Sequence, residues 1–238
     1  MNAYCDRLGF TNSDSARQSK IEAKRPNEED HSRVGKADEE DRFGEVAASQ
    51  NSQNLSGRSI ILFGFKSCGK TTWGKLIADR LNRSFIDTDR LLEDLYFKQT
   101  GRHLNFREIF QTVGNQGFRA LESDVVQQLK DVQGSIIATG GGMVLNPVNT
   151  ALLAKLGQLV YLKVSKETLK RRILDKPELP AFFDPNDPEG SFEMMYTERE
   201  PKYEEIHAFS IDMETQTQDQ VILEIRSLIQ TGRIAYGQ

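Results

Sequence analysis

Residues 59–71 read SIILFGFKSCGKT: a short apolar run of strand type leads into a loop in which Gly64 and Gly69 bracket four residues. Lys70 and Thr71 follow, and a segment with apolar residues at helical spacing begins there. Glycines let successive backbone N–H groups converge on one anion, and the start of a helix adds the positive end of its dipole. This strand–loop–helix order predicts a loop that binds a triphosphate.

The pattern assigns a part to each residue of the loop. Backbone N–H groups of residues 66–72 surround the phosphates, Lys70 neutralises charge on the β- and γ-phosphates, and Thr71 holds Mg²⁺. Cys68 contributes mainly its backbone N–H, and its side chain is interpreted as a small filler. The alternative, a redox-sensing thiol, lacks a second cysteine nearby.

The composition limits the classes of function. The chain has 238 residues, a net charge of −4 and 37% hydrophobic residues. The acidic balance argues against a nucleic-acid-binding protein, although a local cluster of Arg and Lys can still bind anions. No apolar run is long enough to span a bilayer, so no membrane partner is expected. The two cysteines, Cys5 and Cys68, form neither a disulfide framework nor a zinc-binding spacing, which fits a reducing compartment.

Residues 1–56 are expected to form a disordered, charged N-terminal tail. The segment 18–42 is mostly charged and polar, with too little apolar surface to offset its ordering entropy. It is interpreted as a solvated extension or, alternatively, as an interaction arm. The N-terminus has no apolar signal core and is rich in Asp and Glu, unlike a transit peptide, so we expect a cytoplasmic protein.

Strands alternate with helices along residues 57–238, which are expected to form one domain. The expected strands are Ser59–Phe63, Ser84–Asp87, 135–139, 159–164 and Phe209–Asp212. The expected helices are 71–81, 91–99, 106–113, 117–129, Lys166–Leu174 and 220–230. The alternation predicts an α/β fold of three layers, α/β/α, around a central parallel sheet. In such sheets ligands bind beyond the carboxyl ends of the strands.

Two carboxylates, Asp87 and Asp89, stand at the end of the second expected strand. They can face one pocket if the strand has given way to a loop. One could then hold Mg²⁺ through water while the other accepts the proton of an attacking hydroxyl. The alternative is structural, a polar strand end or a helix N-cap by Asp89.

Arg119 and Glu122 lie three residues apart and share a helix face. Such a pair can be a surface ion pair, or an arginine held by its glutamate to grip a substrate carboxylate. The triplet Gly140–Gly142 follows an apolar strand, and close approach of a ligand would explain three glycines in a row. The segment 199–203, REPKY, reads by itself as a charged helix end.

Taken together, these segments resemble the shikimate kinase family. The order GFKSCGKT, FIDTD, FR-x-x-E, ATGGG and R-x-P-x-Y is similar to that of the family, and it covers about residues 59–212. The resemblance implies a P-loop fold of the nucleoside-monophosphate-kinase type, with a small helical substrate-binding subdomain and a mobile lid at about 175–195. It implies transfer of the γ-phosphate of ATP to the 3-hydroxyl of shikimate, on the route to chorismate and the aromatic amino acids. We expect a monomer with shikimate as its small-molecule partner.

The resemblance also implies a role for each matching residue. ATP phosphates would contact Ser67, Cys68, Gly69, Lys70, Thr71 and Thr72, and Arg172 would lie near the adenine. Thr71 and Asp87 would hold Mg²⁺, and Lys70 and Asp89 would be catalytic, with Asp89 as the base. Shikimate would be bound by Asp89, Arg119, Gly140, Gly141, Gly142 and Arg199, the two arginines at its carboxylate. Phe106, Phe110 and Phe118 would line the substrate subdomain.

Two positions depart from the family pattern. Members usually carry an arginine in the lid that reaches the transferring phosphate, and here Leu179 stands seven residues after Arg172, where that arginine would be. Such an arginine is worth about 10³-fold or more in other phosphoryl-transfer enzymes, and Lys176 could replace it as a point charge. The second departure is Asn115, where the family usually has glutamate after Gly114.

Three other interpretations remain at this point. Leu179 favours a kinase-like module that binds nucleotide without turnover. A kinase with another acceptor, such as gluconate, is the second alternative, because gluconate also carries a carboxylate for Arg119 and Arg199. The third is a P-loop scaffold whose tail binds a partner.

Overall fold

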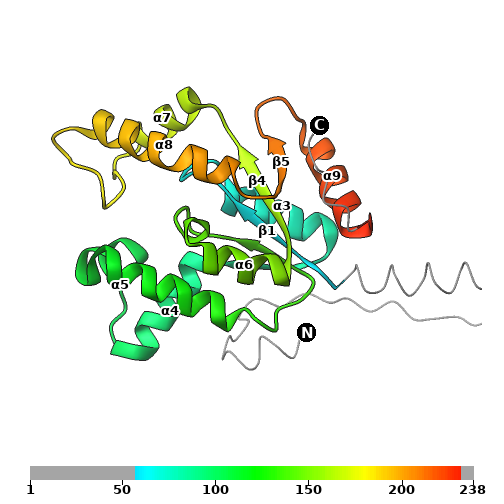
Figure 1. The fold of residues 1–238 in the computed structure, drawn as a ribbon, viewed down its shortest axis with the longest axis horizontal. Coiled ribbons are helices and arrows are strands. Elements are labelled where there is room, and N and C mark those ends of the chain that lie inside the picture. Colours follow the sequence, from blue (N-terminus) through cyan, green and yellow to red (C-terminus); the bar gives the residue numbers. More distant parts are fainter. Residues whose placement is uncertain (1–56, 232–238) are drawn as a thin grey trace, which may run out of the picture. The chain divides into compact units, whose positions relative to one another are not determined.

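The computed structural model describes residues 57–231, and the predicted tail at 1–56 lies outside them. A parallel five-stranded sheet forms the centre, in the order β2-β3-β1-β4-β5 (Figure 1). The strands are β1 (Ser59–Phe63), β2 (Ser84–Asp87), β3 (Ser135–Ala138), β4 (Gly157–Lys163) and β5 (Phe209–Asp212). The expected α/β class and the parallel sheet are confirmed.

Helices cover both faces of this sheet. On one face α3 contacts β1, β2 and β3, and α9 packs beside it against β1; on the other, α6 contacts β4 and also α5 (Figure 1). The helices are α3 (Lys70–Leu81), α4 (Thr88–Thr100), α5 (Phe106–Gln128), α6 (Pro147–Leu156), α7 (Lys166–Leu174), α8 (Pro188–Glu204) and α9 (Gln218–Thr231), with a 3₁₀ turn η1 (Met143–Leu145). Helices α4 and α5 pack on each other and form the small helical subdomain.

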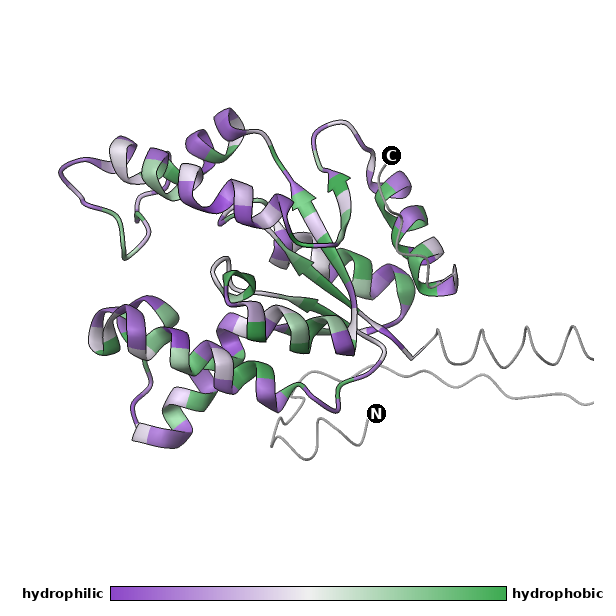
Figure 2. Cartoon of the chain, viewed as in Figure 1, coloured by the Kyte–Doolittle hydropathy of each residue, from purple (hydrophilic) through white to green (hydrophobic). Residues whose placement is uncertain are grey.

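The apolar run that opens the sequence pattern becomes the central strand. Every residue of β1 is buried between β3 and β4, as expected for a parallel strand covered on both faces. Figure 2 shows the hydrophobic residues concentrated in the strands and on the inward sides of the helices. Within residues 57–231, no helix combines the length and apolarity needed to cross a bilayer.

Several element boundaries differ from those expected. Helix α4 begins at Thr88 rather than at residue 91, because the Asp87 side chain accepts a hydrogen bond from the Asp89 N–H and caps the helix. The N-cap is therefore Asp87 and not Asp89. The two helices expected at 106–113 and 117–129 are confirmed, because α5 consists of two helical parts that are separated by a non-helical break at Gly114 (φ 68°).

Two helices were not expected from the sequence. Helix α6 begins with Pro147 after an Asn146 cap. An N-cap followed by proline is a helix start signal, but the apolar residues of the segment gave no helical pattern that would have drawn attention to it. Helix α8 spans Pro188–Glu204 although Pro201 lies inside it. Because α8 begins at Pro188, the irregular part of the predicted lid is confined to residues 175–187.

Candidate active site

A cavity of about 530 Å³ lies at the carboxyl ends of β1, β2 and β3. Its size is typical of a small-molecule site. Almost all predicted site residues line it: Ser67, Gly69, Lys70, Thr71, Thr72, Asp87, Asp89, Arg119, Gly140, Gly141, Gly142, Arg172 and Arg199. Cys68 does not, because its side chain is buried beneath the loop as a free thiol. The buried position fits the small-filler interpretation of Cys68.

The loop between β1 and α3 has the backbone needed to surround an anion. Gly69 has a φ of 102° and Ser67, although not a glycine, has a φ of 68°. Left-handed residues between ordinary ones turn successive N–H groups toward one side of the chain. The Lys70 ammonium donates to the carbonyl oxygens of Gly64 (2.9 Å) and Phe65 (2.7 Å), so it lies within the loop.

The two predicted Mg²⁺ ligands contact each other. The Thr71 hydroxyl donates a hydrogen bond of 2.9 Å to Oδ2 of Asp87, while Oδ1 of Asp87 accepts from the Asp89 N–H. Hard oxygen donors of this kind suit Mg²⁺, which usually keeps water and substrate phosphates as its other ligands. Within the described part of the chain no group of three or more His, Cys, Asp or Glu could form a metal cage. The donors present therefore fit a Mg²⁺ ion that arrives with a nucleotide.

Asp89 lies in the first turn of α4 and faces the cavity. Burial, and the neighbouring Asp87 carboxylate, raise the pKa of Asp89 to about 6, against the opposing effect of Lys70 and Lys66. A carboxylate with a raised pKa is a stronger base than an exposed one and is still ionised at neutral pH. Asp89 can therefore accept a proton in this cavity.

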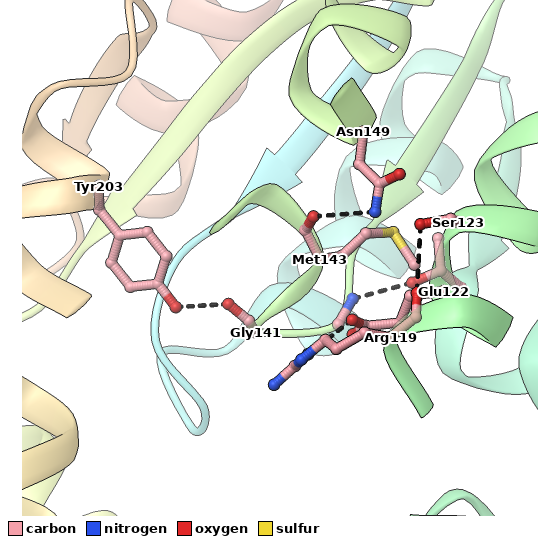
Figure 3. A network of polar contacts seen from close by, with 9 residues as sticks. Arg119, Glu122, Ser123, Gly141, Met143, Asn149 and Tyr203 are labelled. Carbon is pink, nitrogen blue, oxygen red and sulfur yellow. Dashed lines mark hydrogen bonds and ion pairs between the residues drawn. The ribbon is translucent and has the colours of Figure 1, made fainter. Parts of the chain in front are cut away.

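Arg119 and Glu122 form a close ion pair on α5, with 2.6 Å between Nη1 and Oε2. It is not a surface pair, since the Glu122 side chain is only 3% exposed whereas that of Arg119 is 34% exposed. Burial raises the pKa of Glu122, and the Arg119 guanidinium opposes that effect. Glu122 thus orients an arginine whose other nitrogens remain directed to the cavity (Figure 3).

The glycine triplet gives space to charged side chains. A Cβ on Gly142 would lie 2.2 Å from Nη1 of Arg119, and one on Gly140 would lie 2.8 Å from Oδ1 of Asp89. A ligand was the expected reason for these glycines; the structure adds a second reason, that the site's own side chains approach the backbone at two of them.

Two hydroxyls fix the turn formed by the triplet. Thr88 accepts a hydrogen bond of 2.8 Å from the Gly140 N–H, and Tyr203 donates one to the carbonyl oxygen of Gly141 (Figure 3). Tyr203 is fully buried and belongs to the segment that was first interpreted as a charged helix end. Both residues were missed as positioning groups, and the R-x-P-x-Y spacing was the only signal for Tyr203.

Arg199 extends from α8 toward the same cavity as Arg119. It is buried, its Nε has no hydrogen-bond partner within residues 57–231, and its guanidinium lies 5.0 Å from the ring centroid of Phe182. A buried cation with an unused donor is costly unless an anion joins it. The arginines from α5 and α8 therefore form a candidate carboxylate site.

The segment 175–187 between α7 and α8 lies over the cavity. Lys176 donates a hydrogen bond of 2.9 Å to the Ser67 hydroxyl, and Arg172, at the end of α7, approaches the Ser67 carbonyl at 3.4 Å. Phe182 packs against Phe110 of α5, with 6.2 Å between the ring centroids. This segment, which we call the lid, thus contacts both the phosphate loop and the helical subdomain.

Arg107 was not singled out in the sequence, yet it joins the lid to α5. Its guanidinium donates hydrogen bonds to the carbonyl oxygens of Leu179 (2.7 Å) and Glu178 (3.1 Å), and it also pairs with the Glu178 carboxylate at 3.2 Å. The lid is therefore held at the position where the arginine expected from the family is replaced by Leu179. No local sequence pattern announces this contact, because the partners are about 70 residues apart.

Arg107→Ala should loosen the lid. We expect chymotrypsin to cleave next to Phe182 and Phe183 about tenfold faster, because the lost charge-assisted hydrogen bonds stabilise the held position by about 1.5 kcal/mol or more. Arg102→Ala, which removes an exposed arginine without side-chain partners in the described residues, is the matched control. Equal cleavage of both variants and the unmodified chain would show that Arg107 does not hold the lid.

Comparison with known proteins agrees with this geometry. Residues 66–230 match the model of the family described as shikimate kinase. Shikimate kinase of Caldanaerobacter subterraneus subsp. tengcongensis is 38% identical over 71% of this chain and 94% of its own length. That of Geobacter sulfurreducens is 36% identical over 73% of this chain and 91% of its own length.

Solved structures give the same result. Shikimate kinase from Acinetobacter baumannii in complex with shikimate superposes with a TM-score of 0.62 at 26% identity, covering 77% of this chain and 98% of that one. The shikimate kinase of Aquifex aeolicus gives a TM-score of 0.58 at 28% identity, covering 75% and 99%. With the family model matching more than half of its residues, the chain belongs to the shikimate kinase family.

Proposed function

We propose that this protein transfers the γ-phosphate of ATP to the 3-hydroxyl of shikimate. The observation that carries the proposal is one cavity that joins a phosphate-binding loop, a carboxylate of raised pKa and two converging arginines. A phosphate donor, an alcohol and a carboxylate are the chemical groups that these three parts recognise. Shikimate supplies the alcohol and the carboxylate together.

The donor half of the site is the loop with α3. Backbone N–H groups of residues 67–72 would surround the phosphates, with Lys70 between the β- and γ-phosphates and Arg172 on the side of the adenine. Thr71 and Asp87 would hold Mg²⁺, which supplies neutralisation of the phosphate charge when it is bound. Proximity and charge neutralisation do most of the work in phosphoryl transfer.

The acceptor half is formed by α4, α5, the glycine triplet and α8. Arg119 and Arg199 would bind the carboxylate, and Asp89 and the triplet would position the hydroxyls. The 3-hydroxyl oxygen forms the new bond to phosphorus, the bond from phosphorus to the bridging oxygen breaks, and ADP leaves. The hydroxyl proton goes to Asp89.

Every group in this scheme comes from one chain. We therefore propose that the protein acts as a monomer. Its composition and cysteine usage favour the cytoplasm as its compartment. Analytical ultracentrifugation across a range of concentrations tests the first proposal, since a mass of 27.0 kDa at all concentrations is expected for a monomer.

The deciding experiment measures ADP release from Mg·ATP with and without shikimate, with gluconate in a parallel reaction. We expect turnover that depends on shikimate. Turnover with gluconate alone would assign another acceptor. Binding of ATP without ADP release in either reaction would mean that Leu179 has removed catalysis.

Acid should reduce this activity through Asp89. The base must be ionised, and because its pKa is raised to about 6, protonation below that pH removes it. We expect kcat/KM for shikimate to fall about tenfold per pH unit below about pH 6. A profile that stays flat down to pH 5 would argue against Asp89 as the proton acceptor.

A further inference from the structure

The side chain of Lys66, inside the phosphate loop, has no role in the scheme above. It is partly buried and lines the cavity together with Lys70 and Asp89. Its ammonium forms no hydrogen bond or close ion pair with any of the described residues, and its one contact there is a cation–π contact with Phe106, 4.9 Å from the ring centroid. A cation withdrawn from water in this way is unfavourable unless an anion arrives.

The surroundings of Lys66 point to an added anion. Asp89 on α4 attracts it, whereas Lys70 on α3, Arg107 on α5 and Lys176 in the lid all repel it. Burial and these positive neighbours lower the pKa of Lys66 to about 8. Three of the neighbouring cations have other contacts: Lys70 and Arg107 with carbonyl oxygens, and Lys176 with the Ser67 hydroxyl. Lys66 is thus the member of this group whose donors are free.

The position of Lys66 selects the anion. It lines the same cavity as Lys70, on the donor side, and Asp89, where the hydroxyl proton would be received, and it is close enough to both for their charges to act on it. In the transfer step the phosphoryl group passes between these two sides and carries charge on its three equatorial oxygens. We propose that Lys66 binds the phosphoryl group during transfer and stabilises its charge in the transition state.

This role rests on the proposed function and adds a residue to it. The lid carries a single cation, Lys176, and Leu179 brings no charge. Lys66 keeps its proton throughout, so the balance of the reaction is unchanged. A fixed positive charge aimed at charge that develops in the transition state raises kcat more than it tightens ground-state binding.

Lys66→Met keeps the length of the side chain and removes its charge. We expect kcat to fall about 10²-fold, the scale for loss of one group that stabilises a transition state, with the KM values for ATP and shikimate changing by less than about threefold. Lys66→Arg should retain most of the rate. Lys75→Met is the matched control, since Lys75 is exposed on α3 outside the cavity, and its kinetics should equal those of the unmodified chain.

A binding measurement complements the rates. Mg·ADP with aluminium fluoride and shikimate imitates the phosphoryl group in the transition state of the transfer, whereas Mg·ADP alone does not. Lys66→Met should weaken binding of the first about 10²-fold and leave the Kd of the second nearly unchanged. The pH profile gives a third readout: kcat/KM for ATP should fall above about pH 8 in the unmodified chain, because deprotonation removes the charge, and this fall should be absent in Lys66→Met.

Two results would overturn the proposal. One is a Lys66→Met variant that folds and retains its kcat. The other is a rise in the KM for shikimate at unchanged kcat, which would place Lys66 on the acceptor. Turnover of the unmodified chain with shikimate tests the proposed function. The role of Lys66 is tested separately, by the ratio of the rate of the variant to the rate of the unmodified chain.

Discussion

Asp89→Asn is expected to lower kcat with shikimate about 10³-fold, within the usual range for loss of a general base. Asparagine keeps the shape of the side chain but cannot take the hydroxyl proton. Binding of Mg·ATP should remain within about twofold of the unmodified chain, because the phosphate loop and the Thr71–Asp87 contact are untouched. Initial rates and equilibrium nucleotide titration measure the two effects.

The stability of this variant provides an internal check. The folded-state pKa of Asp89 is about 6, above its unfolded value near 3.9, so the ionised carboxylate opposes folding above about pH 6. Asp89→Asn should therefore show an unchanged or higher Tm at pH 8, and any gain should disappear by about pH 4. Asp79→Asn, an exposed aspartate on α3, is the control for the substitution. Rapid turnover by the Asp89 variant would remove this residue from the mechanism.

The parts of this site that could be predicted from sequence are those built from neighbours along the chain. The loop at 64–71 follows a buried strand and begins a helix, and its glycines and lysine act within eight residues. The Arg119–Glu122 pair follows from helical periodicity alone. All five strands were located, because short apolar runs bounded by polar residues are typical of parallel strands.

The contacts that could not be predicted join distant segments. Arg107 and Leu179, or Tyr203 and Gly141, meet only when α5, the lid, α8 and the glycine turn have packed together. Burial of Lys66 is likewise a property of the assembled cavity. Helix α6 was missed because its apolar residues do not follow a clear helical period. Asp87 was favoured as a ligand, and its capping bond to Asp89 emerged only with the backbone geometry.

In the folded protein, Leu179 contributes to the lid contact through its backbone. Its carbonyl oxygen, not its side chain, is the group that α5 recognises through Arg107. Any side chain at 179 could make that contact, so holding the lid does not require the family's arginine. In our proposal Lys66 supplies the charge stabilisation, while Arg107 holds the lid, two tasks that one lid arginine could serve together. The loss of the lid arginine therefore does not require that the protein be catalytically inactive.

Arg119→Ala is expected to raise the KM for shikimate about 10²-fold or more while the KM for ATP changes little. Truncating one partner of a hydrogen-bonded charge pair typically costs about 2–5 kcal/mol, and here the substrate carboxylate would be left with Arg199 alone. Steady-state kinetics with each substrate varied in turn measures this split. An unchanged KM for shikimate would place the carboxylate elsewhere.

The variant must be separated from a merely damaged fold, because it also leaves Glu122 buried without its partner. The pKa of Glu122 is already raised, so the lone carboxylate should make the variant lose stability as the pH rises above about 4. Adding Glu122→Gln removes that carboxylate; the double variant should regain stability but not affinity for shikimate. Methyl shikimate, which lacks the negative charge, sharpens the test. The ester should bind the unmodified chain far more weakly than shikimate does, because it lacks the charge that Arg119 recognises. The two ligands should bind the double variant with more similar affinities, because this variant lacks Arg119.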